Sequence, residues 1–482
     1  MATTSSILPS RRAFVVSKSS VEVAPDADRA STRLIYAYIA CATIWLLIGT
    51  LVGEYLGIKF AAPDIDHISW LSYGRLRPVH TNTVFWGWAS LAMIALALYV
   101  VPKTSRSALY SRPQAWIALG LINVSVLAGN LTLMAGINNG GQEYREYIWP
   151  IMAVFAAGVI MVAYNLIRTI ADRTIEEIYI SNWYIMGGFL WTIALLLIAY
   201  FPAYQATAVS ETVIQGFYMH MGVGMWFTPM VLGLTYYFLP SLLNKPIYSY
   251  SLGVLAFWTQ MTFYSMLGAH HFVYAPIPWA LQTVAIIFSV GMIVTLAAGT
   301  GNFLMTMKGS FHTIARSYSL PFILVGVVSY FVFSLQGTFE AFRSLNQLWH
   351  FTNFTIAHSH LTMYAFIVFL IWGGIYGVLP RLSGREPSQL LVGVHFWLAL
   401  VGVALYTIAL MVGGTLQGMS WIAGAAFIKS VELLAPFYLW RAVGGTLMFL
   451  SHLIFAYNVW CMRPVGELAD STAAPAAEGG QA

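Results

Sequence analysis

Long apolar runs, separated by short polar or turn-forming segments, make up most of the chain. A bilayer-spanning helix needs about 20 mostly apolar residues, and about twelve segments reach that length, at roughly 34–57, 80–102, 114–136, 147–169, 183–203, 212–240, 250–273, 277–306, 317–336, 353–380, 389–413 and 434–461. The pattern predicts an all-α, polytopic membrane protein with about twelve transmembrane helices in one domain at 34–463. An N-terminal tail at 1–33 and a flexible C-terminal tail at 464–482 would flank it.

Composition agrees with a membrane protein and excludes other classes. Hydrophobic residues are 59% of the 482 residues and charged residues only 9%, whereas soluble domains have roughly 25% charged residues. Mean hydropathy is +0.72. A soluble enzyme, a nucleic-acid-binding protein and a disordered scaffold are therefore excluded. With the N-terminus inside, sixteen of the 23 Lys and Arg residues lie in inside segments and seven outside, so the positive-inside rule predicts two cytoplasmic termini.

Histidines, and not cysteines, carry the metal chemistry that this sequence offers. The only cysteines, Cys41 and Cys461, form no haem-attachment, dinuclear-copper or iron–sulfur motif. Of eleven histidines, six lie within or at the ends of predicted spans: His80, His220, His270, His271, His358 and His360. One intramembrane histidine is often just bonded to a backbone carbonyl. Six on four helices favour a functional site.

His358 and His360 lie two residues apart, about 200° around a helix. They cannot chelate one ion, but they can serve cofactors on opposite sides of one helix, and tetrapyrroles suit this because each takes an axial imidazole. His80 could supply the second axial bond to one of them. Arg75 and Arg77 would then lie one turn outward, near haem propionates. Taken alone, an arginine near a helix start is more often a lipid-headgroup anchor.

A second cluster is expected where the seventh predicted span ends. His270 and His271 are followed by prolines, and a frayed helix end would let both imidazoles converge with His220 of the preceding helix. Three imidazoles suit copper, zinc or non-haem iron. Tyr264 lies six residues before His270, although one buried tyrosine among 27 carries little information.

Together these motifs resemble subunit I of the haem–copper oxidase superfamily, most closely the cbb(3)-type cytochrome c oxidases. The similarity extends over nearly the whole chain from about residue 34 and rests on these segments: 74–80 (Gly-Arg-Leu-Arg-Pro-Val-His), 143–146 (Glu-Tyr-x-Glu), 246–250 (Pro-Ile-Tyr-Ser-Tyr), 264–271, 357–360 (Ala-His-Ser-His), 395–397 (His-Phe-Trp), 444–445 and 456–458. A shorter segment between Glu340 and His358, and Met219 before the first copper histidine, depart from the family pattern.

The resemblance implies a role for each matching residue. His80 and His360 would ligate a low-spin haem b, and His358 a high-spin haem b. His220, His270 and His271 would hold copper, and Tyr264 would be the active-site tyrosine, cross-linked to His220. Glu143 would bind calcium between haem propionates with help from Glu146, and His350 would lie near the high-spin propionates.

The implied activity is reduction of oxygen to water, coupled to proton translocation, in a bacterial inner membrane. The chain has no electron-entry motif, so it would need mono-haem and di-haem cytochrome c subunits, with cytochrome c as donor and a small helical subunit as a further partner. Protons would enter along the sixth and seventh spans. The polar residues there are Tyr237, Ser249, Tyr250, Ser251, Thr259 and Gln260. For each of them alone, interhelical hydrogen bonding is the more common role.

Two alternatives remain at this point. A nitric oxide reductase would share the fold and haems but replace copper with iron, aided by a glutamate one turn after the first metal histidine. Gly224 occupies that position here, and Tyr264, which reductases lack, is present. A non-redox transporter would show intramembrane charges and matching halves. The predicted spans carry few acids, and the two halves do not match.

Overall fold

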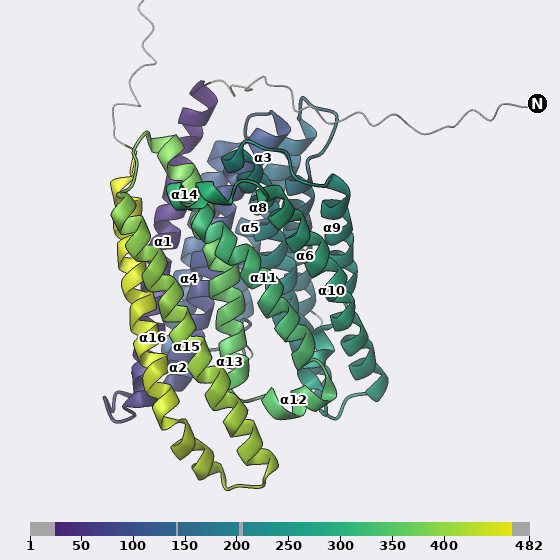
Figure 1. Ribbon diagram of the computed structural model, residues 1–482, viewed down its shortest axis with the longest axis vertical. Helices are drawn as coiled ribbons and strands as arrows, with labels where there is room; N and C mark the ends of the chain where they lie inside the picture. Colours follow the sequence, from purple (N-terminus) through teal and green to yellow (C-terminus); the bar gives the residue numbers. More distant parts are fainter. Residues whose placement is uncertain (1–24, 141–142, 202–205, 465–482) are drawn as a thin grey trace, which may run out of the picture.

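The expected spans fold as a bundle of helices running side by side, with the short helix α12 lying across one end (Figure 1). The computed structural model describes residues 25–140, 143–201 and 206–464, and within them it contains helices and no strand. Most of the two predicted tails, at 1–24 and 465–482, lies outside these residues. The first helix begins at Pro25, several residues before the expected start.

Ten helical segments of the described chain are long and apolar enough to cross a membrane. Eight of them are single helices: α1 (Pro25–Ala61), α4 (Arg112–Met134), α5 (Trp149–Ala171), α6 (Ile180–Tyr200), α10 (Trp279–Met307), α11 (Leu320–Glu340), α15 (Gln389–Ile422) and α16 (Phe427–Cys461). The other two are composite: α2 (Tyr73–Asn82), η2 (Thr83–Ala89) and α3 (Ser90–Ser105), then α13 (Asn353–His360), η7 (Leu361–Val368) and α14 (Phe369–Ser383).

The remaining two expected spans are also present as helices. One is composite, with α7 (Val209–Met221), η4 (Gly222–Phe227) and α8 (Thr228–Leu243). The other, α9 (Tyr250–Tyr264), has 15 residues, because its α-helix ends nine residues before the expected 273. Short connecting turns complete the described chain: η1 (Ser69–Leu71), η5 (Gly268–Phe272), η6 (Phe311–Arg316) and α12 (Arg343–Trp349). About twelve membrane helices are therefore consistent with the structure.

The composite helices form the enclosed centre of the bundle. In the most apolar stretch of α2–η2–α3, 94% of the residues are buried, and in α13–η7–α14 the share is 89%. The other eight candidate spans have 33% to 50% buried. Residues of η4 and α8 are also almost all buried. Sequence runs that are hydrophobic on every side thus occupy the interior, whereas one-sided helices face the surroundings.

Each central helix contains a π-helical turn just after its histidines. The segments η2, η4 and η7 begin at Thr83, Gly222 and Leu361, one to three residues beyond His80, His220 and His360. A π turn inserts one extra residue, and such turns are frequent at functional sites. The Ser90 hydroxyl donates to Phe85 O over 2.9 Å, and the Trp226 indole donates to Ser90 over 2.9 Å. Two of the widened turns are therefore tied together.

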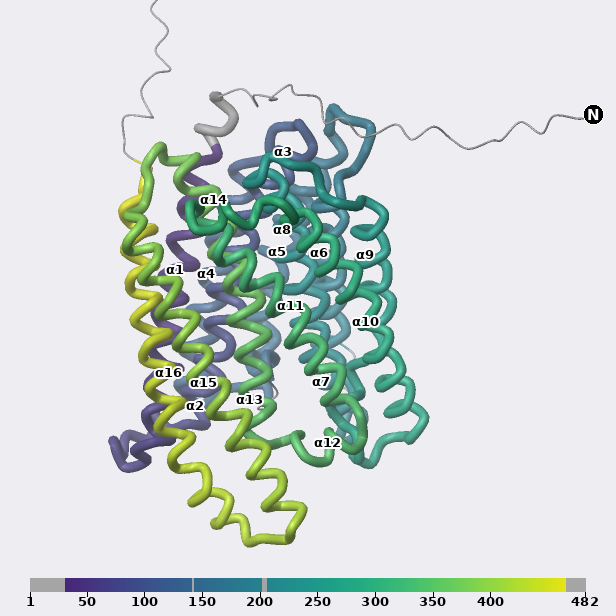
Figure 2. The backbone as a smooth tube through the Cα atoms, viewed as in Figure 1, coloured from purple at the N-terminus to yellow at the C-terminus, as the bar shows by residue number. Residues whose placement is uncertain are grey.

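Helices α15 and α16 form a long hairpin at one side, and its turn projects past the other helices (Figure 2). Glycines allow the two helices to pack closely. A Cβ atom on Gly402 would lie 2.9 Å from Gly444 O, and one on Gly444 would lie 2.6 Å from Tyr406 N. Small residues at such contacts are typical of helix pairs in membranes.

Candidate metal and haem centre

Two cavities lie on opposite sides of α13, as the spacing of His358 and His360 predicts. The first, here called the trihistidine cavity, has about 880 Å³ of empty space, its opening included, and is lined by His358 together with His220, His270 and His271. The second, the bis-histidine cavity, has about 1330 Å³ on the same measure and is lined by His360 and His80. Ser359 lines both. One turn of helix therefore separates the two chambers.

In the trihistidine cavity, His220, His270 and His271 bring one nitrogen each to within 4.8 Å of the others. His220 extends from α7, whereas the other two lie on η5, a 3-10 turn. The helix ends at Tyr264 and the chain tightens into this turn, so adjacent side chains converge as they would not on an α-helix. His271 Nε2 lies 2.8 Å from His220 Nδ1. This is the geometry of a three-imidazole metal site.

Tyr264 stands beside this cluster and fills space that Gly224 leaves open. Its ring is stacked on that of His220, with 4.8 Å between centroids and 9° between planes. A Cβ atom on Gly224 would lie 1.6 Å from Tyr264 Cε1. No side chain at 224 can therefore coexist with this tyrosine position. Gln260, one turn before Tyr264, donates to Gly224 O over 2.6 Å and holds the two helices together.

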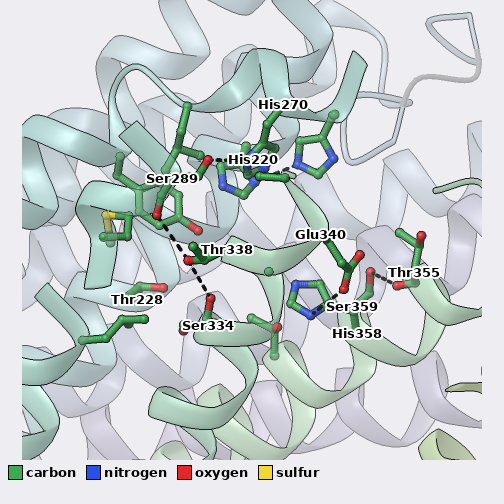
Figure 3. Close-up of a pocket in the computed structure, with 18 of the residues that line it drawn as sticks. His220, Thr228, His270, Ser289, Ser334, Thr338, Glu340, Thr355, His358 and Ser359 are labelled. Atoms are coloured by element: carbon green, nitrogen blue, oxygen red, sulfur yellow. Dashed lines mark hydrogen bonds and ion pairs between the residues drawn. The ribbon is translucent and has the colours of Figure 1, made fainter. Parts of the chain in front are cut away.

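His358 faces the cluster from the other side of the cavity (Figure 3). Its Nδ1 lies 3.0 Å from Gln336 Oε1 and 3.4 Å from Glu340 Oε1. Both partners belong to α11. An oxygen acceptor at Nδ1 leaves Nε2 unprotonated and available to a metal. Sequence reasoning identified the histidine but missed Gln336, which has no motif of its own.

The same device recurs at three other histidines. His80 Nδ1 lies 2.7 Å from Gly49 O, and His360 Nδ1 lies 2.8 Å from Ile356 O. His270 Nδ1 lies 2.7 Å from the Ser289 hydroxyl, which itself donates to Ala285 O. Carbonyl oxygens only accept, so these rings donate through Nδ1 and keep a free lone pair at Nε2. Four of the predicted ligands are thus oriented in advance.

Arg77, Glu143 and Glu146 meet at the outer end of the bis-histidine cavity. Arg77 Nη2 lies 3.0 Å from Glu146 Oε1, and its Nη1 lies 3.9 Å from Glu143 Oε1. Asn82 donates to the other Glu146 oxygen over 2.8 Å. Both carboxylate oxygens of Glu146 therefore have partners. Glu143 lines the cavity with 41% of its side chain exposed, and it is the acid of the pair with the longer contact to Arg77.

Side chains of neighbouring helices hold the loop that carries these acids. Tyr144 has a left-handed backbone (φ 62°), which is unfavourable for a bulky residue. Its carbonyl accepts from the Trp86 indole over 3.2 Å and from the Tyr218 hydroxyl over 3.0 Å. Glu143 O accepts from Gln215 over 2.9 Å. These bonds stabilise the turn that directs Glu143 toward the cavity.

The structure separates Arg75 from Arg77. Arg75 donates to Met134 O over 2.9 Å and does not line the bis-histidine cavity, whereas Arg77 does. A role for Arg75 beside propionates stays a prediction. His350 lines the trihistidine cavity, as expected for a residue near the high-spin group. Burial lowers the pKa of His350 to about 4, so the ring is neutral at pH 7.

Replacing Arg77 by methionine should destabilise the fold through Glu146. Burial already raises the pKa of Glu146 to about 7, and Arg77 opposes that rise. Breaking a buried pair costs about 3 kcal/mol. Because the raised pKa favours the neutral carboxyl in the folded protein, the loss of stability in the Arg77 variant should grow as pH rises above 7. Thermal unfolding in detergent at pH 6 and 8.5 measures it. The double variant with Glu146→Gln should remove the pH dependence, and an unchanged dependence would contradict this pairing.

Both cavities suit the groups that the histidines predict. Three neutral nitrogens suit copper and equally zinc or iron. Gln260, Tyr330 and Thr362 each point a buried oxygen toward the trihistidine cavity without a hydrogen-bond partner in the described residues. The bis-histidine cavity has mainly apolar walls, and two imidazoles and the guanidinium groups of Arg77 and Arg441 also line it. Such walls suit a flat apolar ring with anionic substituents.

Sequence comparisons identify related proteins over nearly the full chain. A family model described as cytochrome c and quinol oxidase polypeptide I matches residues 33–447. The Cbb3-type cytochrome c oxidase subunit CcoN1 of Stutzerimonas stutzeri is 29% identical over 89% of this chain and 94% of its own length. The bacteroid cytochrome c oxidase subunit 1 homolog of Bradyrhizobium diazoefficiens is 32% identical over 88% of this chain and 81% of its own.

A solved structure shares the fold. It is a cryo-EM structure of a heme-copper terminal oxidase dimer, and it superposes with a TM-score of 0.74. The match covers 90% of this chain and 85% of the other, at 15% sequence identity. At that identity the likeness establishes the arrangement of helices and no more.

Proposed function

The chain belongs to the cytochrome c and quinol oxidase polypeptide I family, and from that premise we propose that it reduces oxygen to water between His358 and the three-histidine cluster. It is a multi-pass membrane protein and the catalytic subunit of an oxidoreductase, in line with relatives named cytochrome c oxidase subunit 1. The single observation that carries the proposal is the pair of cavities flanking α13.

The proposed loading follows from which imidazoles face each chamber. His80 and His360 would hold a low-spin haem b, His358 would hold a high-spin haem b, and His220, His270 and His271 would hold copper. Arg77 would bind propionate oxygens, and Glu143 would contribute to a calcium site. When bound, these groups would supply electron transfer to the oxygen-binding site.

The protein itself supplies the orientation of the ligands and a proton. Gln336, Ser289 and two backbone carbonyls orient four of the six imidazoles through their Nδ1 atoms. Tyr264 lines the trihistidine cavity and can give one electron and its phenolic proton to the reacting oxygen. Gln260 and Thr228 line the same cavity. The proposed path of protons from the cytoplasm enters the cavity at these two residues.

Oxygen, and not nitric oxide, is the substrate that this chamber fits. The alternative requires a carboxylate next to the three histidines, one turn after His220. Tyr264 occupies the space that any side chain at Gly224 would need, with a Cβ-to-ring distance of 1.6 Å. The tyrosine at position 264 therefore requires a glycine at position 224. With this pair of residues, the cavity contains the Tyr264 phenol where the alternative would have a second carboxylic acid.

The relatives' names place this chain in a larger assembly. The relative in Stutzerimonas stutzeri is a subunit of a Cbb3-type oxidase, and this chain is accordingly one subunit of an oxidase complex. We propose mono-haem and di-haem cytochrome c subunits as its electron inlets, with a small helical subunit and cytochrome c as donor. The proposed location is a bacterial inner membrane with both termini in the cytoplasm.

Tyr264→Phe should lower oxygen turnover by about a hundredfold or more while both haems and copper stay bound. The change removes one phenolic donor, and a positioned proton donor contributes about 10²- to 10⁴-fold. Oxygen-electrode rates and metal analysis of the purified complex measure the two effects. Tyr38→Phe is the matched control, because this buried tyrosine donates to Ala115 O, outside the cavity. Full activity of Tyr264→Phe would exclude the phenol from the reaction.

A further inference from the structure

One acid inside the membrane has no part in the site described so far. Glu54 lies in α1 within the candidate span Ser31–Ala61, and it lines the bis-histidine cavity. Its chain neighbour Gly53 packs directly against His80, because a Cβ atom there would lie 2.4 Å from the imidazole Cε1. An ionisable side chain in a membrane span is costly and is usually retained for function.

Only one of the two carboxyl oxygens of Glu54 has a hydrogen-bond partner in the described residues. Thr446 of α16 donates its hydroxyl proton to Glu54 Oε1 over 2.6 Å. Oε2 is buried and has no hydrogen-bond partner in the described residues. It lies over Gly445, where a Cβ atom would come within 2.4 Å. A protonated carboxyl tolerates this position better than a carboxylate, which needs donors at both oxygens.

No salt bridge fixes the charge of Glu54 either. Within the described chain, Glu54 forms no ion pair within 4 Å. Arg441 of α16 is the cation whose charge acts on the Glu54 carboxyl, and it lines the same cavity. Its guanidinium lies 4.4 Å from the Phe60 ring centroid and 5.6 Å from that of Tyr406. The charge state of Glu54 therefore depends on Arg441 and on the total charge within the cavity.

We propose that Glu54 is the redox-linked proton-binding residue of the bis-histidine cavity. This inference rests on the proposed function, which puts the low-spin haem there. As that haem gains one electron from the electron donor, Glu54 takes one proton from water, and its carboxylate becomes a carboxyl. On reoxidation the proton is released. The net charge of the cavity then stays constant, which removes the cost of adding negative charge in a low-dielectric space.

Other titratable groups face the same space and must be distinguished from Glu54. The charged ones are Arg77 of α2, Arg441 of α16 and Glu143 of the α4–α5 loop. His80 and His360 would not titrate while they ligate the haem, and the tyrosines that line the cavity are at positions 73, 144, 364 and 406. Glu143 is one remaining competitor for the proton, and His452 of α16 is the other. Its Nε2 lies 2.9 Å from the Tyr364 hydroxyl and its Nδ1 3.0 Å from Thr50 Oγ1.

The test is a redox titration of the low-spin haem in the purified oxidase complex between pH 6 and 9. One proton per electron changes the redox equilibrium tenfold per pH unit, about 59 mV for a one-electron couple. The native complex should approach this slope over part of the range, and E54Q should be flat. His452→Gln should keep the slope. Glu432→Gln removes an exposed acid of α16, paired with Lys429, and should also keep it.

Thr446→Val gives an independent check without removing the acid. The carboxylate loses the donor that stabilises its ionised form, so the sloping region should move to higher pH. An E54Q complex that keeps the bis-histidine spectrum and the native slope would overturn the inference and leave the proposed function intact. Loss of the slope in His452→Gln alone would also overturn it. A native complex without a bis-histidine haem would overturn both.

Discussion

His220→Ala should leave the protein without copper and lower oxygen turnover by about a thousandfold or more. His220 is one of three nitrogens within 4.8 Å of one another, and its ring contacts both partners. Loss of one ligand of three leaves a site that cannot hold the ion. A metal contributes several kcal/mol to such a reaction, and about 1.4 kcal/mol corresponds to a factor of ten. Elemental analysis and oxygen-electrode rates measure both effects.

Ser289→Ala is the graded control for this variant. The Ser289 hydroxyl touches His270 Nδ1 but is not itself a ligand, and loss of such an outer partner lowers metal affinity about 10- to 100-fold. Copper should therefore be retained at high supply and lost on mild chelation, with both haems unaffected. Oxygen turnover that survives in His220→Ala would remove this histidine from the metal site.

His80→Ala should delete the low-spin haem signal and leave the haem that binds external ligands. His80 and His360 are the two imidazoles of the bis-histidine cavity, and a six-coordinate haem cannot persist with one of them. His358 faces the other cavity, so carbon monoxide should still bind there. Electron delivery should fail, and turnover with cytochrome c should fall at least as far as in His220→Ala. Optical and electron-paramagnetic spectra separate the two haems.

His452→Gln is the matched control, because His452 lines the same cavity without facing His360 as a predicted ligand. It bonds to Tyr364 and Thr50, and its replacement should leave both haem spectra in place. Retention of the low-spin signal in His80→Ala would refute the ligand assignment. Loss of that signal in His452→Gln would refute it in favour of His452.

Much of this arrangement could be predicted from the sequence because it depends on periodicity. A spacing of two residues puts His358 and His360 on opposite faces of any helix, and the two cavities follow from that. The convergence of His270 and His271 required a broken helix, and the prolines after them gave the signal. The α-helix nevertheless ends at Tyr264, earlier than the apolar run suggested, because hydropathy does not register a 3-10 turn.

The rest depends on contacts between segments distant in sequence. The π turns after His80, His220 and His360 have no residue signature, since their hydrogen bonds form only in the packed core. Gly224 and Tyr264 are 40 positions apart, so the sequence offered them as two separate indications. Glu54 lay unnoticed in an apolar run, and only the structure places it on a cavity wall.

The haem and metal content of the purified complex tests the central claim most directly. The claim is that α13 separates a bis-histidine haem from a second haem facing copper. Pyridine haemochrome and elemental analysis should give two b-type haems and one copper ion for each copy of this chain. Two haems with additional iron and no copper would instead indicate a nitric oxide reductase, and a chain without haem would contradict the account altogether.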